Sequence, residues 1–121
     1  MKKTVVLGAS TKPGRYASIA SNLLVSHGHK IVPVGIKSGV VANEEILDLR
    51  SLPEIPEVDT ITMYIGTANQ PAWYDYILSL KPKRIIFNPG TENQELKQMA
   101  EEDGIEVVYG CTLVMLRLGR Y

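Results

Sequence analysis

A loop rich in hydrogen-bond donors and positive charge follows the first apolar run of the chain. It reads Gly-Ala-Ser-Thr-Lys-Pro-Gly-Arg-Tyr over residues 8–16 and opens a segment with helical periodicity. Backbone N–H groups in a strand-to-helix loop, together with the positive end of the helix dipole, can bind an anion. Ser10 and Thr11 add hydroxyl donors, and Lys12 and Arg15 add positive charge. We therefore predict a phosphate site here, in preference to a plain turn with solvated basic residues.

The spacing of residues in this loop argues against two common nucleotide-binding motifs. Ser10 stands where the fingerprint G-x-G-x-x-G has its second glycine, and Gly14 is not followed by the Lys-Ser/Thr of a Walker motif. A typical NAD site also has an acidic residue at the end of the second strand, for the ribose hydroxyls. This chain has Lys37 there. A lysine at this position favours a ribose that carries a phosphate, which argues against NAD.

The side chains that most often carry catalysis do not form a set in this sequence. Cys111 is the only cysteine, so an internal disulfide and a Cys-x-x-Cys zinc site are excluded. His27 and His29 follow the first predicted helix, at the opposite rim from Cys111 in a parallel sheet. We expect Cys111 to be a partly buried residue in a turn. The histidines are expected at the surface, where their positive form would suit a helix end. No metal site is predicted.

Short apolar runs, mostly β-branched, alternate with segments of helical period. Nearly continuous runs of this kind are typical of strands covered on both faces of a parallel sheet. The expected strands span residues 4–7, 30–34, 60–65, 84–87 and 105–109. The expected helices have buried stripes made of Tyr16, Ile19, Ala20, Leu23 and Leu24 in the first and of Trp73, Ile77 and Leu80 in the second, with Tyr74 and Tyr76 exposed. A third helix is expected to begin with a capping box at residues 91–94.

This alternation predicts an α/β fold: a three-layer, doubly wound parallel sheet, Rossmann-like, with about five strands. We expect residues 1–121 to form one domain. Residues 39–56 are less regular, and residues 44–49 fit either a short strand or a helical turn. In such sheets small ligands bind beyond the carboxyl ends of the strands, where the strand order reverses. The loops after the first four strands are therefore the candidate site.

Composition limits the partners of the protein. Its 121 residues include 13 Lys+Arg and 13 Asp+Glu, for a formal net charge of zero. A nonspecific nucleic-acid binder usually carries a basic excess, so we expect no nucleic-acid partner. The apolar run behind the basic residues 1–3 is shorter than a secretory signal or a membrane span requires. We therefore expect a cytoplasmic protein with no membrane partner.

The ordered set of segments from Val5 to Arg15, from Val32 to Lys37 and at the next two strand ends resembles the CoA-binding domain family. These small Rossmann-like proteins are similar to the nucleotide-binding domain of the succinate–CoA ligase alpha subunit. The resemblance extends over residues 3–118. It implies that the Gly-Ala-Ser segment and the following Lys-Pro bind the CoA diphosphate, that residues 35–37 receive the adenosine 3′-phosphate end, and that residues 64–67 lie along the adenine and pantetheine. The expected ligand contacts are Gly8, Ala9, Ser10, Thr11, Lys12, Pro13, Tyr16, Gly35, Ile36, Lys37, Ile65, Gly66 and Thr67.

The leading hypothesis is a protein that binds CoA or an acyl-CoA without catalysis of its own. An enzyme that uses NADP or another phosphorylated nucleotide is one alternative. Another is an interaction module that no longer uses its pocket. Residues 112–116 read Thr-Leu-Val-Met-Leu, which is apolar enough to pack against another subunit, as in a homodimer. Relatives often have a Cys-x-x-x-Glu-like segment at this place, and this chain lacks its acidic residue.

Overall fold

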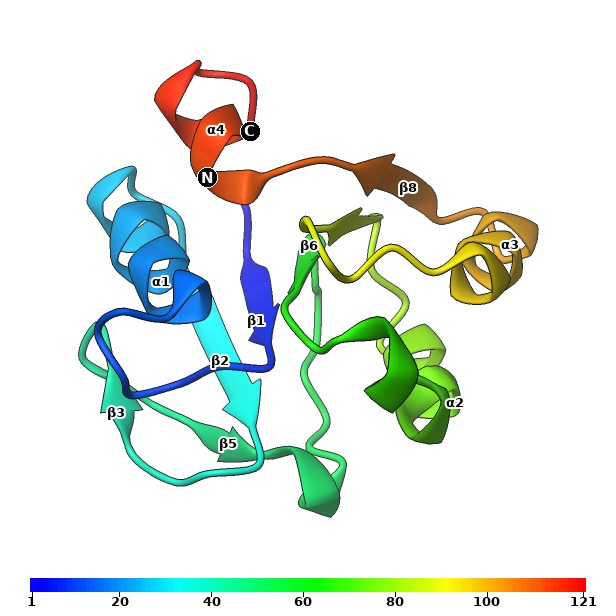
Figure 1. Cartoon of the computed structure of the whole chain (residues 1–121), viewed down its shortest axis with the longest axis horizontal. Coiled ribbons are helices and arrows are strands. Elements are labelled where there is room, and N and C mark those ends of the chain that lie inside the picture. Colours follow the sequence, from blue (N-terminus) through cyan, green and yellow to red (C-terminus); the bar gives the residue numbers. More distant parts are fainter.

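A parallel six-stranded sheet with the order β5-β2-β1-β6-β7-β8 forms the centre of the molecule (Figure 1). The computed structural model describes all residues, 1–121. The strands are β1 (Thr4–Leu7), β2 (Ile31–Gly35), β5 (Leu47–Asp48), β6 (Thr60–Met63), β7 (Arg84–Phe87) and β8 (Glu106–Tyr109). The chain runs outward from β1 to β2 and β5 and then returns to β6 on the other side of β1. The strand order therefore reverses between β1 and β6, which confirms the predicted doubly wound, Rossmann-like α/β fold.

Two helices cover each face of the sheet. On one face lie α1 (Tyr16–Ser26) and α4 (Thr112–Arg117), and on the other lie α2 (Tyr74–Ser79) and α3 (Gln94–Glu102). Figure 1 shows the two pairs of helices on opposite sides of the strands. Side chains alternate along each strand, so the two faces have separate apolar cores. In β1, Val5 and Leu7 belong to the core under α2 and α3, whereas Val6 belongs to the core under α1 and α4.

The irregular segment after β2 contains both of the elements considered for it. An antiparallel hairpin, β3 (Val40–Val41) and β4 (Glu44–Glu45), comes first and is separate from the main sheet. The strand β5 follows and adds a sixth, two-residue strand beside the carboxyl end of β2. A 3-10 turn, Leu49–Ser51, then leads the chain away from the sheet. The remaining 3-10 turns, Thr67–Asn69 and Pro71–Trp73, precede α2.

The buried face of α1 differs from the predicted stripe at its first residue. Tyr16 is 71 % exposed, so its assignment to the buried face was wrong. Ala17, Ala20, Ser21 and Leu24 are buried instead, at the spacing of one helical face. Tyr16, at the first position of the helix, instead lies beside the loop that precedes it.

The start of α3 was also misplaced by two residues. Asn93 is the N-cap, and its carboxamide oxygen accepts a hydrogen bond from the backbone N–H of Leu96 at 3.0 Å. Thr91, the expected cap, instead donates its hydroxyl to the carbonyl of Asn88 at 2.8 Å. The chain needs an extra turn through Gly90, at φ 90°, before it can enter the helix. Thr91 is part of that turn, so the N-cap is the next residue with a suitable side chain, Asn93.

Aromatic and apolar residues of the second half are more buried than expected. Tyr76 is buried, not exposed, and its hydroxyl donates to the carbonyl of Pro53 at 2.7 Å. Trp73 packs against the core, as predicted. The apolar C-terminal segment forms α4, which packs on α1 of the same chain and buries Leu113 and Leu116. None of the helices has the length and hydropathy needed to cross a membrane.

Candidate functional site

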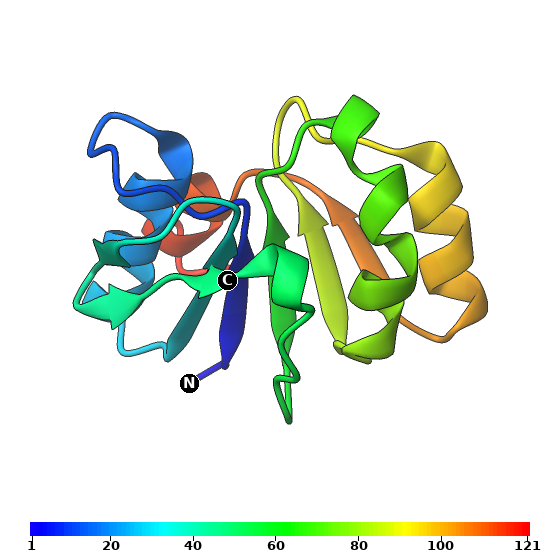
Figure 2. The same ribbon diagram turned by 90° about the horizontal axis from the view of Figure 1, so that it is seen from below.

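Four loops meet at the carboxyl edge of the sheet, after β1, β2, β6 and β7 (Figure 2, upper edge). They enclose an open cleft of about 410 Å³, within the range of small-molecule sites. The cleft includes the ends of β1 and β6, where the strand order reverses. Its lining consists of Gly8, Ala9, Ser10, Thr11, Lys12, Arg15, Tyr16, Ala17, Ile36, Lys37, Tyr64, Gly66, Pro89, Gly90 and Thr91. The position is the one that the fold predicts for a ligand.

Close contacts between main chains form the base of the cleft. A Cβ atom on Gly8 would lie 2.9 Å from the carbonyl carbon of Tyr64, and the φ of Gly8 is +95°. A Cβ on Gly35 would lie 2.7 Å from the carbonyl oxygen of Ala9. Only glycine fits at these two places without moving a neighbouring backbone. The ends of β1, β2 and β6 are thus drawn together, which brings their loops onto one site.

The loop after β1 presents unused donors. The N–H groups of Gly8 and Ala9 both donate to the carbonyl of Val34, at 2.9 and 3.0 Å, so they are not free for a ligand. The N–H groups of Ser10 and Thr11 have no acceptor within the chain. No side chain caps α1, and no acidic residue lies in its first turn. The donors available to an anion are therefore fewer than the whole loop contains: these two N–H groups and those at the open end of α1.

The charge of the cleft has a single sign. Lys12, Arg15 and Lys37 line it, and no aspartate or glutamate does. None of the three forms an ion pair with a carboxylate of the chain. Cations that are free of internal partners attract an anionic ligand, and they lose no existing interaction when they bind one.

A buried polar network lies behind the cleft wall. Asn88 donates from its amide nitrogen to the hydroxyl of Thr62 and to the carbonyl of Met63, both at 2.8 Å. Its amide oxygen accepts from the N–H of Thr112 at 2.9 Å. Asn88 thereby joins β6 and β7 to the start of α4. Beside this network, burial raises the pKa of the Tyr64 phenol to about 12.

A second network fixes the loops after β6 and β7 to each other. The fully buried Gln70 donates to the carbonyls of Ile65 and Thr91, at 2.9 and 2.8 Å. Asn93 donates to the side-chain oxygen of Gln70 and to the hydroxyl of Tyr74, both at 2.8 Å. These hydrogen bonds join the two loops through buried side chains.

The structure brings most of the expected contact residues together. Gly8, Ala9, Ser10, Thr11, Lys12, Tyr16, Ile36, Lys37 and Gly66 line the cleft. Four others lie beside it. Pro13 is exposed in the same loop, Gly35 lies under Ala9, Ile65 packs against the core, and Thr67 donates its hydroxyl to the carbonyl of Glu92 at 2.7 Å.

Other lining residues were not among the expected contacts: Arg15, Ala17, Tyr64, Pro89, Gly90 and Thr91. Arg15 was expected only to add positive charge to the phosphate site, and Tyr64 only as part of the segment 64–67 along the adenine and pantetheine. The segment at residues 89–91 follows β7, which pairs with β6, so its place at this edge follows from the strand order. The loop after β7 was part of the predicted candidate site, but none of its residues was named as a contact.

Cys111, His27 and His29 lie outside the cleft lining. Cys111 is partly exposed just before α4, as predicted. His27 is exposed at the end of α1. The Nδ1 atom of His29 accepts from the N–H of Lys2 at 2.9 Å, and burial lowers the pKa of this imidazole. The expectation of a positive form is therefore wrong for His29. No group of three or more His, Cys, Asp or Glu side chains is arranged to hold a metal ion.

Comparisons with known proteins agree with this arrangement. A model described as the CoA binding domain matches residues 2–117. The crystal structure of an uncharacterized protein is 55 % identical, with a TM-score of 0.96, and the match covers 100 % of this chain and 98 % of that chain. A search of curated proteins gave no match.

More distant structures share the fold. A structure from Thermus thermophilus is 23 % identical with a TM-score of 0.84, over 99 % of this chain and 90 % of that chain. A dinucleotide forming acetyl-coenzyme A synthetase 1 from Ca. Korarchaeum cryptofilum, in complex with phosphate and ADP, is 18 % identical with a TM-score of 0.71. That match covers 90 % of this chain and 25 % of the synthetase chain, so the fold recurs as one part of a larger enzyme.

Proposed function

Because the chain belongs to the CoA-binding domain family, we propose that it binds coenzyme A or an acyl-CoA in the cleft at the carboxyl edge of the sheet, without catalysis of its own. The diphosphate would bind at the N–H groups of Ser10 and Thr11 and at the open end of α1. Lys37 would pair with the phosphate on the ribose. The proposal includes a cytoplasmic location and a single domain over residues 1–121.

The observation that carries this proposal is the unopposed positive charge of the cleft. Lys12, Arg15 and Lys37 approach it from two loops, and no carboxylate lines it. A CoA molecule carries phosphates at two separate places, and these cations are likewise divided between the loop after β1 and the loop after β2. The groups of the cleft also lack a nucleophile with an adjacent base, which favours binding over catalysis.

Calorimetric titration of the purified protein with CoA, dephospho-CoA, NAD and NADP, at fixed salt, tests the proposal. We expect micromolar binding of CoA that exceeds the binding of the other three. A preference for NADP would replace the proposal by a nucleotide-dependent enzyme, because Lys37 suits a 2′-phosphate equally well. If none of the four binds, the cleft is unused and the interaction module is the better description.

The variant Lys37→Glu tests the assignment of the ribose phosphate. We expect CoA binding to weaken by about tenfold or more, because a charged hydrogen bond is replaced by repulsion, while dephospho-CoA binding changes by less than about threefold. Lys30→Glu, an exposed charge reversal just before β2 at the other edge of the sheet, is the control. Equal weakening of both ligands by Lys37→Glu would show that the lysine does not contact this phosphate.

A further inference from the structure

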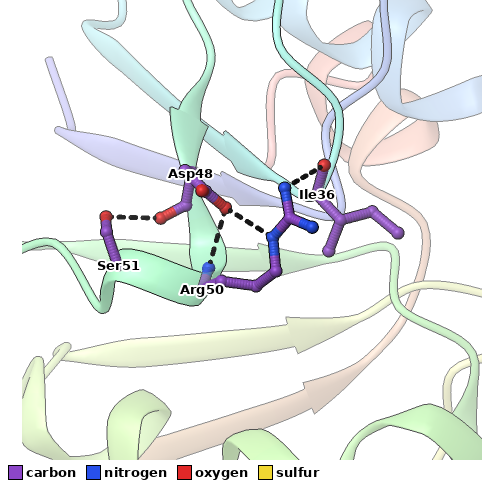
Figure 3. A network of polar contacts seen from close by, with 4 residues as sticks. All are labelled: Ile36, Asp48, Arg50 and Ser51. Carbon is purple, nitrogen blue, oxygen red and sulfur yellow. Dashed lines mark hydrogen bonds and ion pairs between the residues drawn. The ribbon is translucent and has the colours of Figure 1, made fainter.

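Arg50 connects the 3-10 turn after β5 to the loop after β2 (Figure 3). Its Nε donates to the carboxylate of Asp48 at 3.1 Å, and its Nη2 donates to the carbonyl of Ile36 at 3.2 Å. The same carboxylate oxygen accepts from the backbone N–H of Arg50 at 3.0 Å, and the hydroxyl of Ser51 donates to the carbonyl of Asp48 at 2.7 Å. The guanidinium of Arg50 therefore bonds to the carboxylate of Asp48 through one nitrogen and to the carbonyl of Ile36 through another.

The loop that Arg50 holds is a wall of the cleft. Ile36 and Lys37 line the cleft on one side and a second cavity of about 360 Å³ on the other, where Arg50 and Asp48 also lie. No other side chain donates a hydrogen bond to the backbone of residues 36–39. At its far end the loop touches the cleft's first loop, because Gly39 packs on the methyl group of Thr11. Arg50 is thus the side-chain support of the segment from which Lys37 projects.

We infer that Arg50 is a positioning residue: by holding the Ile36 carbonyl it fixes the main chain before Lys37, and it thereby sets the preference of the cleft for a ligand with a phosphate on its ribose. This inference rests on the proposed function. It adds to it a residue that does not line the cleft and that acts through the loop.

The chemistry of the pair favours support over direct contact. The positive charge of Arg50 is already paired with Asp48, and hydrogen bonds from Arg50 hold the pKa of that carboxyl below its usual value. An arginine fork can bind two acceptors at fixed angles, whereas a lysine ammonium cannot reproduce that geometry. Both side chains are more than half exposed, so the ion pair itself contributes little to stability. Variants at these positions are therefore expected to fold.

The test compares the variants Arg50→Gln, Arg50→Lys and Asp48→Asn with the wild type. The quantity measured is the ratio of the Kd for dephospho-CoA to the Kd for CoA, by calorimetry on the whole chain. The matched control is Lys97→Gln, which removes the exposed ion pair with Glu101 on α3. Thermal melting, with shifts of no more than about 5 °C expected for all four variants, checks that the fold is intact.

We expect both Arg50 variants to lower the ratio by about three- to tenfold, the usual worth of one net hydrogen bond. Asp48→Asn, whose amide oxygen can still accept from Arg50, should lower it by less, and the control should leave it unchanged. If Arg50→Lys keeps the wild-type ratio, charge and not position matters, and the inference is overturned. An increase of the ratio in Asp48→Asn would also overturn it, because it would mean that Arg50 contacts the phosphate directly and that Asp48 competes for it. If the wild type prefers CoA and Arg50→Gln keeps the same preference, this inference is refuted and the proposed function is not. A wild type that binds no CoA refutes the proposed function as well.

Discussion

Adding a single methyl group at Gly8, in the variant Gly8→Ala, should lower the stability of the fold. The φ of Gly8 is +95°, a region that L-residues rarely adopt, and an added Cβ would lie 2.9 Å from the carbonyl carbon of Tyr64 and 3.0 Å from the N of Ile65. Both neighbours are main-chain atoms at the end of the central strand β6, so no side-chain rotation can relieve the contact. The variant Gly8→Ala must therefore move the backbone of β1, of β6, or of both.

The expected cost is the sum of two effects. A left-handed backbone at a residue with a Cβ costs about 1–2 kcal/mol, and forcing extra volume into a filled site costs about 1–3 kcal/mol. We expect Gly8→Ala to lower the free energy of unfolding by about 2–5 kcal/mol. Gly14→Ala is the matched control in the same loop, since its φ is not positive and no atom lies within 4 Å of its added Cβ. That variant should leave stability unchanged or raise it slightly, because alanine restricts the unfolded chain.

Urea unfolding followed by the fluorescence of Trp73, the only tryptophan, measures both variants. With a slope of about 2 kcal/mol per molar urea, the midpoint of Gly8→Ala should fall by about 1–2.5 M. CoA titration of the folded variant then reports the ligand site separately. Equal midpoints for Gly8→Ala and Gly14→Ala would refute the reasoning, because they would show that the ends of β1 and β6 are not in contact as described.

Two further predictions concern a buried phenol and a helix cap. Burial raises the pKa of Tyr76 to about 12, above its unfolded value of 10.0, so its contribution to stability is complete below about pH 10 and is lost as the pH rises toward 12. Tyr76→Phe should lower the free energy of unfolding by about 0.5–1.5 kcal/mol at neutral pH. Between about pH 10 and 12, urea unfolding should show the variant losing less stability than the wild type. If the stabilities of the two proteins fall in parallel over this range, the assignment of the raised pKa to Tyr76 is wrong. Asn93→Ala should lower stability by about 0.5–2 kcal/mol through loss of the α3 cap, and by more through loss of its hydrogen bonds to Gln70 and Tyr74. Melting curves in which Thr91→Val is the more damaging change would restore the capping box at residue 91.

The fold was predictable because burial on both faces leaves a strong pattern. Val5, Ile61 and Ile85 stand at the same register in β1, β6 and β7 and are all fully buried, so the strands read as continuous apolar runs. Nothing comparable marks β5, whose two residues pair only with the last two of β2. A strand that short has too little periodicity to be distinguished from a turn, and its position depends on tertiary contacts.

The candidate site was predictable in its loops and less so in its individual contacts. A residue next to a strand end lies near the carboxyl edge whatever its type, so the segments at residues 8–16 and 35–37 could be assigned from the topology. Whether a particular side chain faces the cleft depends on local turns. Tyr64 contributes to the cleft lining and packs on the core under α1 and α4, whereas Ile65 packs on the opposite core and its carbonyl accepts from Gln70 at 2.9 Å. Long-range hydrogen bonds of that kind have no signal in a single sequence.

The cleft combines a fixed base with adjustable charges. Its base depends on backbone contacts at Gly8 and Gly35, and its far wall depends on the fully buried Gln70, so neither can change without cost to the fold. The cations, in contrast, are exposed and have no internal partner. Substitution of Lys37 should therefore alter which phosphate the cleft accepts and leave stability nearly unchanged, whereas substitution of Gly8 should do the opposite. A protein built in this way can change its ligand preference through a few surface residues while the same six-stranded sheet persists.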